Sequence, residues 1–185
     1  MNTIATDRLR LRMMTMDDAD FILTLLNTEG WLRYIGDRKV HTLEQAQDYL
    51  THRVLLDYAK FGFGFYVIER LNDQKQIGTC GLTKREGLDL VDLGFALLTP
   101  YEGQGYAFEA ASAMLDFGFL SCKLGQIGAI TTTDNHRSLS LLNKLGMKFI
   151  KLTTLSGEDD ELMLYSIEAS ERIERIEESE IQETR

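Results

Sequence analysis

The stretch that decides the fold is Tyr101-Glu102-Gly103-Gln104-Gly105-Tyr106-Ala107. It follows the apolar run Leu93–Leu98 and opens an amphipathic run that continues to about Phe119. A strand that turns through glycines into a helix leaves backbone N–H groups unpaired at the positive end of the helix dipole. The sequence therefore predicts a phosphate or pyrophosphate site at this turn, although a tight connection without a ligand fits the same residues.

The elements around this turn predict an α+β fold. Period-2 alternation and β-branched runs indicate seven strands, and capping patterns at Thr15 and at Thr42 with Gln45 indicate the starts of helices. Strand, helix and strand alternate around the turn, which favours a mixed sheet flanked by helices. The predicted strands are 8–13, 62–68, 76–83, 90–98, 127–133, 149–154 and 162–167.

Length and composition favour one domain with a separate tail. The chain has 185 residues, 44% of them hydrophobic, which is enough for a sizeable core. Residues 168–185 contain seven Glu and three Arg, with isoleucines at near-helical spacing. We therefore expect a domain over residues 1–167 and an acidic, helical C-terminal extension over 168–185, with a frayed tail as the alternative.

Five motifs, in this order, resemble those of the GNAT superfamily of acetyl-CoA-dependent N-acetyltransferases, in its RimJ/RimL-like branch, which acetylates ribosomal-protein N-termini. The glycine turn is similar to the superfamily's pyrophosphate loop, except that Glu102 stands where Gln or Arg is usual. The similarity covers about residues 6 to 167. The motifs are Thr6–Arg12, Ile77–Leu82, Asp92–Phe95, Glu102–Ala107 and Asp134–Met147.

The resemblance implies that the fourth and fifth predicted strands splay apart and that acetyl-CoA, as cosubstrate, lies between them. Its pantetheine arm would pair with the backbone of the fourth strand, where an unpaired N–H would hold the thioester oxygen. An asparagine at the start of the helix after the fifth strand would hold the pantetheine arm, and a serine there would face the thioester sulfur; the alternative is that they are only the N-cap and a first-turn residue of that helix. The implied coenzyme-binding residues are Phe95, Leu97, Leu98, Gly103, Gln104, Gly105, Tyr106, Ala107, Asn135 and Ser138.

The resemblance also implies direct attack of an amine on the thioester. Asp92 matches the strand position where several relatives carry a catalytic Glu. Because the Asp side chain is one methylene shorter than Glu, Asp92 would act as a base through a water. The alternative is that its carboxylate only orients the acceptor amine or stabilises a turn. Glu86 is a weaker substitute. The Tyr that many relatives use as general acid would fall at Asn143, so Ser138, or a water that it positions, replaces it here.

The acceptor is expected to be a primary amine, either a protein N-terminus or a small molecule. An acidic protein surface suits a cationic acceptor. Aromatic residues near the start of the chain and in the second predicted strand are candidate pocket walls, although aromatic strand residues are often core residues. These candidates are Trp31, Tyr34, Phe63, Phe65 and Tyr66.

Charge and motif content argue against several other classes. The net charge of −9 argues against a nucleic-acid partner. The sequence has no apolar run long enough for a membrane span and no signal-peptide pattern, so we expect a cytoplasmic protein, monomeric or homodimeric. Cys80 and Cys122 have no metal-ligand spacing and are expected to be reduced structural cysteines. The scattered histidines predict no metal site.

Two other functions fit parts of the sequence. A non-catalytic acyl-CoA-binding module would retain the fold without the catalytic Tyr and with the shortened base. A dinucleotide-binding domain would use the glycine pair, but Phe108 occupies the third glycine position and no acidic ribose partner follows. The N-acetyltransferase is the leading interpretation.

Overall fold

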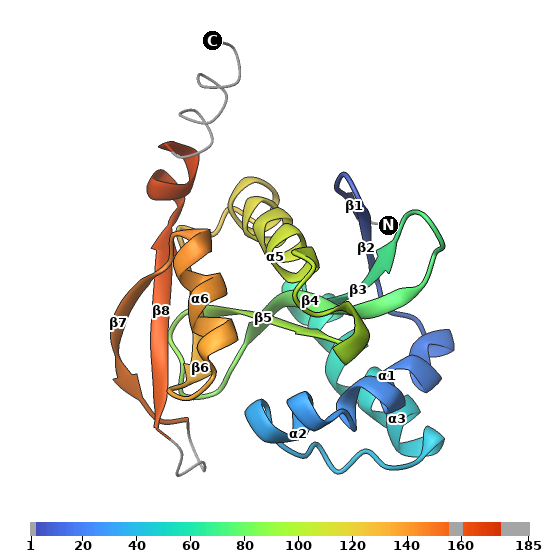
Figure 1. Cartoon of the computed structure of the whole chain (residues 1–185). Coiled ribbons are helices and arrows are strands. Elements are labelled where there is room, and N and C mark those ends of the chain that lie inside the picture. The colour runs from blue at the N-terminus through green and yellow to red at the C-terminus, as the bar shows by residue number, and fades with distance from the viewer. Residues whose placement is uncertain (1–2, 156–160, 175–185) are drawn as a thin grey trace.

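A computed structural model describes residues 3–155 and 161–174, which form a single mixed sheet flanked by helices (Figure 1). The sheet order is β1-β2-β3-β4-β5-β6-β8-β7. Its strands are β1 (Thr3–Ala5), β2 (Leu9–Met13), β3 (Phe65–Arg70), β4 (Gln76–Lys84), β5 (Val91–Leu97), β6 (Gln126–Thr132), β7 (Lys148–Thr153) and β8 (Leu162–Glu168).

The helices fall into an N-terminal group and a pair that follows β5 and β6. The α-helices are α1 (Ala19–Leu26), α2 (Glu29–Tyr34), α3 (Leu43–Tyr49), α4 (Leu56–Phe61), α5 (Tyr106–Asp116) and α6 (His136–Leu145). A π-helical segment, Leu50–Leu55, joins α3 to α4, and another, Phe117–Ser121, follows α5. Short 3-10 turns precede α1 (Met16–Asp18) and α5 (Thr99–Tyr101).

The sheet has eight strands, so the prediction of seven was wrong by one. The additional strand, β1, is three residues long and pairs antiparallel with β2, with Ile4 opposite Leu11. Such a short segment has no room for a period-2 pattern, and only the pairing defines it as a strand. The predicted fourth and fifth strands are therefore β5 and β6.

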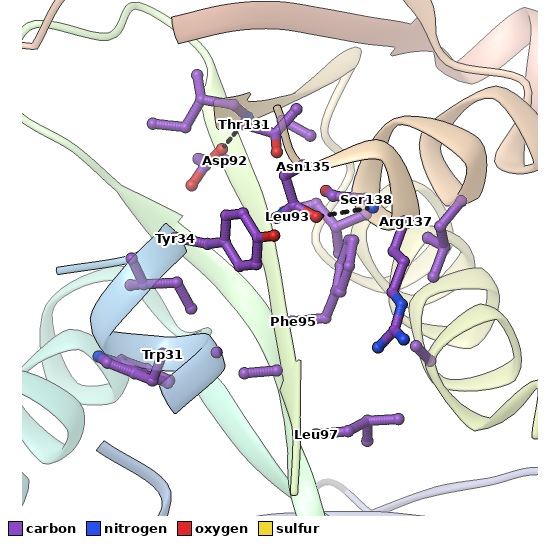
Figure 2. Close-up of a pocket in the computed structure, with 18 of the residues that line it drawn as sticks. Trp31, Tyr34, Asp92, Leu93, Phe95, Leu97, Thr131, Asn135, Arg137 and Ser138 are labelled. Carbon is purple, nitrogen blue, oxygen red and sulfur yellow. Dashed lines mark hydrogen bonds between the residues drawn. The ribbon is translucent and has the colours of Figure 1, made fainter. Parts of the chain in front are cut away.

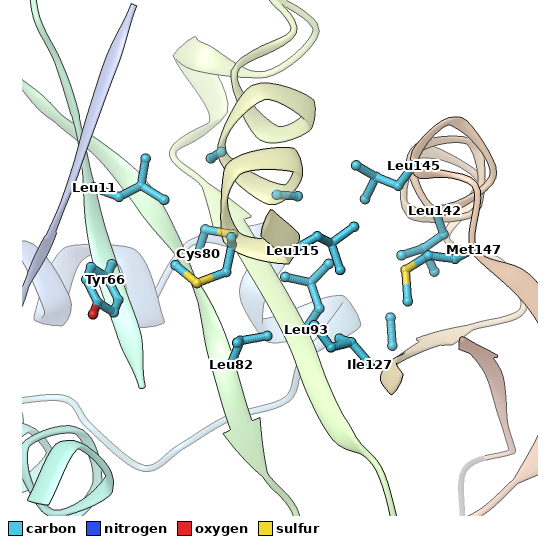
Figure 3. Packing of buried hydrophobic residues seen from close by; sticks show 14 of the residues in the cluster. Leu11, Tyr66, Cys80, Leu82, Leu93, Leu115, Ile127, Leu142, Leu145 and Met147 are labelled. Atoms are coloured by element: carbon cyan, nitrogen blue, oxygen red, sulfur yellow. The ribbon is translucent and has the colours of Figure 1, made fainter. Parts of the chain in front are cut away.

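The two faces of the sheet bury separate apolar clusters. On β3, Val67 packs with the cluster of α1, α2 and α3, whereas Tyr66 and Ile68 belong to the cluster on the opposite face. Figure 3 shows Leu93 and Leu115 of this second cluster, which contains residues of α5 and α6. Side chains alternate across a strand, so a central strand such as β3 contributes to both clusters. The N-terminal helices thus cover one face, and α5 and α6 cover the other.

β5 and β6 run parallel and separate after two residue pairs. Only Val91↔Ile127 and Asp92↔Gly128 are paired, whereas β5 pairs with β4 along its whole length, from Val91 to Leu97. Beyond Gly128, β6 continues its pairing with β8. The expected splay is therefore present, and it exposes the edge of β5 that faces β6.

The described part of the C-terminal extension is helical over 169–174 and packs against α5. The Arg172 guanidinium donates to both carboxylate oxygens of Asp116, at 2.8 and 3.0 Å, and to the Ser112 hydroxyl at 2.6 Å. Residues 175–185, on which the rest of the helical prediction falls, lie outside the described residues. The contact is at the C-terminal end of α5, the end opposite the glycine turn.

Deletion of the chain after Ile167 should leave coenzyme affinity unchanged. The deletion removes the Arg172 contacts at the far end of α5 but nothing from the turn at its N-terminus. Calorimetric titration with coenzyme A checks this, and size-exclusion chromatography reports any change in association state. A loss of affinity of about 10-fold or more, roughly 1.4 kcal/mol, would assign the extension to the binding site.

Candidate active site

The glycine turn presents a row of free amides at the start of α5. Gly103 and Gly105 have φ of +72° and +84°, left-handed values that favour glycine. No amide from Gly103 to Phe108 donates to a protein acceptor among the described residues; the first bond of the helix is from Glu109 N to Gly105 O, at 3.1 Å. Unpaired amides at a helix N-terminus bind anions, and this site fits a phosphate or pyrophosphate group.

The segment before β2 holds this turn from outside. The Arg8 guanidinium donates to the carbonyl of Gln104 at 3.1 Å and to the Glu109 carboxylate at 2.6 Å. Thr6 also donates to Glu109, at 2.6 Å. Burial would raise the pKa of Glu109, but the hydrogen bonds from Thr6 and Arg8 outweigh it and hold the pKa below its ordinary value. An ionised Glu109 therefore ties the N-terminal segment to the turn.

The edge of β5 offers a second set of unpaired backbone groups. Leu98 N donates to Ile77 O at 2.8 Å, which continues the β4–β5 register. Hydrogen bonds alternate along an antiparallel ladder, so the backbone groups of Phe95 and Leu97 point away from β4 toward the splay. Their N–H groups are free for a ligand, while the carbonyl of Leu98 also accepts from Tyr101 N at 2.9 Å. Phe95 and Leu97 thus differ from Leu98, whose backbone is already paired.

Asn135 and Ser138 lie at the start of α6, across the splay from β5 (Figure 2). The Asn135 side-chain oxygen accepts from Ser138 N at 3.1 Å and caps the helix, which ends at a left-handed Gly146. The cap uses the oxygen alone, so the Asn135 amide NH2 remains able to donate. Both residues line the cleft, so capping and ligand contact are compatible.

The splay opens into a cleft of about 1400 Å³ that extends to both sides of β5. On the α5 and α6 side, it is lined by predicted coenzyme-binding residues. Gln104 does not line it, because the Gln104 side chain donates to Pro100 O at 2.9 Å, and neither does Leu98. The predicted coenzyme-binding residues that line the cleft are Phe95, Leu97, Gly103, Gly105, Tyr106, Ala107, Asn135 and Ser138.

Asp92 lies at the point where β5 and β6 separate. Its side chain is 1% exposed, and one carboxylate oxygen accepts from Arg85 Nε at 2.5 Å. The other accepts from Ile130 N at 3.1 Å, a β6 amide just beyond the last β5–β6 pair (Figure 2). Burial raises the pKa of Asp92, while Arg85 and the Ile130 amide lower it, and the net shift is upward. Asp92 therefore both bridges the two strands and borders the cleft.

The candidate acceptor walls divide between cleft and core. Trp31 and Tyr34 of α2 and Phe65 of β3 line the cleft, and Tyr34 points across β5 toward Asn135 (Figure 2). Phe63 and Tyr66 are instead core residues of the cluster under α5, 5% and 1% exposed. An alternating strand places neighbouring aromatic residues on opposite faces, which periodicity alone does not assign to core or cleft.

Two ion pairs that sequence reasoning missed cross the cleft. Glu102, the departure in the glycine turn, pairs with Arg137 of α6, and Arg33 of α2 pairs with Asp134 at 3.2 Å. The partners are 35 and 101 residues apart in the chain, so no local spacing could have indicated them. Arg85, the partner of Asp92, was missed as well. The only feature of the sequence that could have indicated this ion pair is that Arg85 and Asp92 lie on either side of the turn between two predicted strands.

Other expected features are only partly addressed by the structure. In its described part, no group of three or more His, Cys, Asp or Glu is placed to hold a metal ion. None of the helices described is long and apolar enough to cross a membrane. Cys80 is buried and Cys122 partly buried, and neither forms a disulfide. Cytoplasmic location, oligomeric state and the absence of a nucleic-acid partner stay predictions.

Comparison with known proteins identifies the family. Residues 8–148 match the acetyltransferase (GNAT) domain. The uncharacterized N-acetyltransferase YoaA of Bacillus subtilis (strain 168) is 31% identical over 146 residues, which cover 78% of this chain and 82% of that protein. The chain therefore belongs to the GNAT acetyltransferase family and is an N-acetyltransferase enzyme.

Solved structures of similar fold include ribosomal-protein acetyltransferases. The ribosomal-protein-S5-alanine acetyltransferase of Vibrio fischeri has a TM-score of 0.76 at 19% identity, over 91% of this chain and 97% of that one. RimL, a ribosomal L7/L12 alpha-N-protein acetyltransferase in complex with coenzyme A, has a TM-score of 0.77 at 16% identity, over 90% and 98%. These neighbours agree with the RimJ/RimL-like resemblance and, at such identities, show the fold.

Proposed function

We propose that the protein transfers the acetyl group of acetyl-CoA to a primary amine, the α-amine of a peptide or a small amine, by direct attack. The observation that carries the proposal is that one cleft contains two sets of unpaired backbone groups. These are the free amides from Gly103 to Phe108 and the open edge of β5. The first suits the pyrophosphate of the coenzyme, and the second suits the amide groups of its pantetheine arm.

Backbone groups are the main means by which this protein holds the coenzyme. With a net charge of −9, the chain has no bulk positive charge to attract an anionic coenzyme. The amides from Gly103 to Phe108 would hold the pyrophosphate, and the N–H groups of Phe95 and Leu97 would pair with pantetheine. One of these β5 amides, or the Asn135 amide NH2, would donate to the thioester oxygen as negative charge develops there.

Asp92 is the proposed base. The attacking amine has to lose a proton, and the raised pKa of Asp92 makes it a stronger base than an ordinary carboxylate. Its side chain alternates with those of Phe95 and Leu97, so it is on the face of the sheet that the N-terminal helices cover, with the aromatic walls from α2. Since both oxygens already accept hydrogen bonds, the proton would reach Asp92 through a water, as its short side chain requires.

Ser138 is proposed to act at the leaving group. When the C–S bond breaks, the thiolate needs a proton or a hydrogen-bond donor, and the partly buried Ser138 lines the coenzyme side of the cleft. Its hydroxyl, or a water that it positions, would donate to the sulfur. The products are an N-acetyl amine and coenzyme A as the free thiol. The amine proton passes to Asp92 and then to solvent, and solvent supplies the proton that the thiolate takes up, through Ser138 or the water that it positions.

The direct test is release of free thiol from acetyl-CoA in the presence of mixed peptide and small primary amines. We expect thiol release that depends on the amine and is matched by N-acetylated product in the mass spectrum. Coenzyme binding by calorimetry without turnover of any amine would favour the alternative, a non-catalytic acyl-CoA-binding module. Neither binding nor turnover would reject both.

A further inference from the structure

Three arginines line the acceptor side of the cleft, and two of them have no carboxylate partner among the described residues. Arg38 follows α2, Arg53 lies in the π-helical segment after α3, and Arg85 follows β4; all three line the cleft. Arg85 is committed to Asp92 at 2.5 Å. The guanidinium groups of Arg38 and Arg53, in contrast, have no hydrogen bond or ion pair with any residue that the structure describes.

The positive charges of all three arginines act on one side chain of the cleft, Tyr49 at the end of α3. Tyr49 lines the same cleft, one turn before Arg53. Burial raises the pKa of Tyr49, and the positive charges of Arg38, Arg53 and Arg85 oppose that shift. Tyr49 is therefore protonated at neutral pH, and its O–H is a hydrogen-bond donor in the cleft that Arg38 and Arg53 also line.

Less negative than positive charge acts on Tyr49. Asp57 of α4 is the carboxylate that acts on Tyr49, and its contact is a 3.4 Å hydrogen bond from Thr83. Glu29 and Glu86 also border the cleft. With Arg85 paired to Asp92, the charges that act on Tyr49 are those of two unpaired guanidinium groups and of the Asp57 carboxylate, in a chain with a net charge of −9.

Coenzyme binding does not account for this arrangement. The amides that suit the pyrophosphate are in the turn before α5, and Phe95 and Leu97 pack with the cluster under α5. The free arginines belong to the N-terminal helical group, which covers the opposite face of the sheet. A guanidinium group binds carboxylates and phosphates through paired N–H donors, so the arrangement fits an anionic group.

We propose that the acceptor amine carries an anionic group, a carboxylate or a phosphate, that Arg38 and Arg53 bind with the Tyr49 hydroxyl. This inference rests on the proposed acetyl transfer and narrows its acceptor. The bound anion would orient the amine toward the thioester from the acceptor face. The substrate class is therefore an acidic amine, such as an amino acid or a peptide whose N-terminal residues bear a carboxylate or a phosphate.

The test compares pairs of acceptors that differ in the anion alone. The peptide amides Ala-Asp and Ala-Asn test a side-chain carboxylate, Ala-phosphoserine and Ala-serine test a phosphate, and alanine with alaninamide tests an α-carboxylate. Rates of thiol release are expressed per free amine, because the amine pKa differs within a pair. We expect a preference of about 10-fold or more in kcat/KM for the anionic member of at least one pair, the size of a charge-assisted hydrogen bond.

Variants of the two arginines test whether Arg38 and Arg53 cause the preference for an anionic acceptor. Arg38→Gln and Arg53→Gln should each reduce it, mainly through a higher KM for the anionic member, while acetyl-CoA affinity and turnover of the neutral member stay unchanged. The control is Lys151→Gln, which removes a cation from the exposed strand β7 outside the cleft and should alter neither member.

Two outcomes separate this inference from the function on which it rests. Equal turnover of anionic and neutral members, or a preference that survives both arginine variants, overturns the anionic acceptor and leaves acetyl transfer intact. Absence of thiol release with every amine tested overturns both.

Discussion

Gly105→Asp should abolish acetyl-CoA binding while the protein stays folded. Gly105 precedes the first turn of α5 with φ of +84°, and it lines the cleft beside the free amides. An aspartate there would place a carboxylate where the pyrophosphate is proposed to lie. A Cβ at this position would come within 3.3 Å of the Arg8 guanidinium, which can move because it is on a flexible side chain.

A matched variant separates charge from backbone strain. Asn has nearly the shape of Asp and tolerates the left-handed region about as well, so Gly105→Asn introduces similar strain without the charge. We expect Gly105→Asn to weaken coenzyme binding and Gly105→Asp to remove it. Calorimetric titration with acetyl-CoA measures both, and circular dichroism checks the fold. Wild-type affinity in a folded Gly105→Asp protein would reject the assignment of this turn to the coenzyme.

The second large effect is expected from Asp92→Asn. If Asp92 accepts the amine proton through a water, loss of its charge should lower kcat by roughly 100-fold or more, the usual size of general-base catalysis. The substituted asparagine would keep a side-chain oxygen for the Ile130 amide, so the contact between β5 and β6 would be partly preserved. Acetyl-CoA affinity should therefore change little. Steady-state kinetics and calorimetry on the same preparation test both statements.

The pH dependence distinguishes a base from an anchor. A base is unnecessary once the amine is free, so the rate defect of Asp92→Asn should shrink as the pH approaches the amine pKa, roughly 8 for an α-amine and above 10 for a lysine-like amine. If Asp92 only holds the splay through Arg85 and Ile130, the defect should persist at all pH values and coenzyme affinity should fall as well.

Two other results of the Asp92→Asn experiment would give Asp92 a different role or none. A higher KM for the acceptor with nearly preserved kcat would make Asp92 a positioning residue for the amine. Asp89→Asn is the control, because Asp89 is an exposed carboxylate in the connection just before β5 and does not line the cleft. Wild-type turnover of Asp92→Asn at neutral pH would remove Asp92 from the mechanism and point to Glu86 or to bulk water.

Local patterns predicted those parts of the fold that local interactions decide. Asn135 caps α6 and Gly146 ends it, as their residue types indicate, and the capping box of Thr42 and Gln45 opens α3. The glycine turn begins α5 where the sequence places it. β1 was missed because three residues define a strand only through their partner.

Contacts across the cleft could not be predicted in the same way. Nothing within the sequence near Glu102 indicates Arg137 as its partner, and nothing near Arg38 and Arg53 indicates that the charges of both act on Tyr49. The assignment of Leu98 illustrates the same limit, because a strand pattern does not say which backbone groups an adjacent strand already uses. Register, and not composition, separates Leu98 from Phe95 and Leu97.

Hydrogen exchange at the β5 amides tests most directly whether the coenzyme lies in the splay. Without ligand, the amides of Phe95 and Leu97 should exchange quickly and that of Leu98, which donates to Ile77 O, slowly. Saturating coenzyme A should slow exchange at Phe95 and Leu97 and leave Leu98 nearly unchanged. Coenzyme binding that leaves both amides unprotected would contradict a coenzyme paired with the open edge of β5.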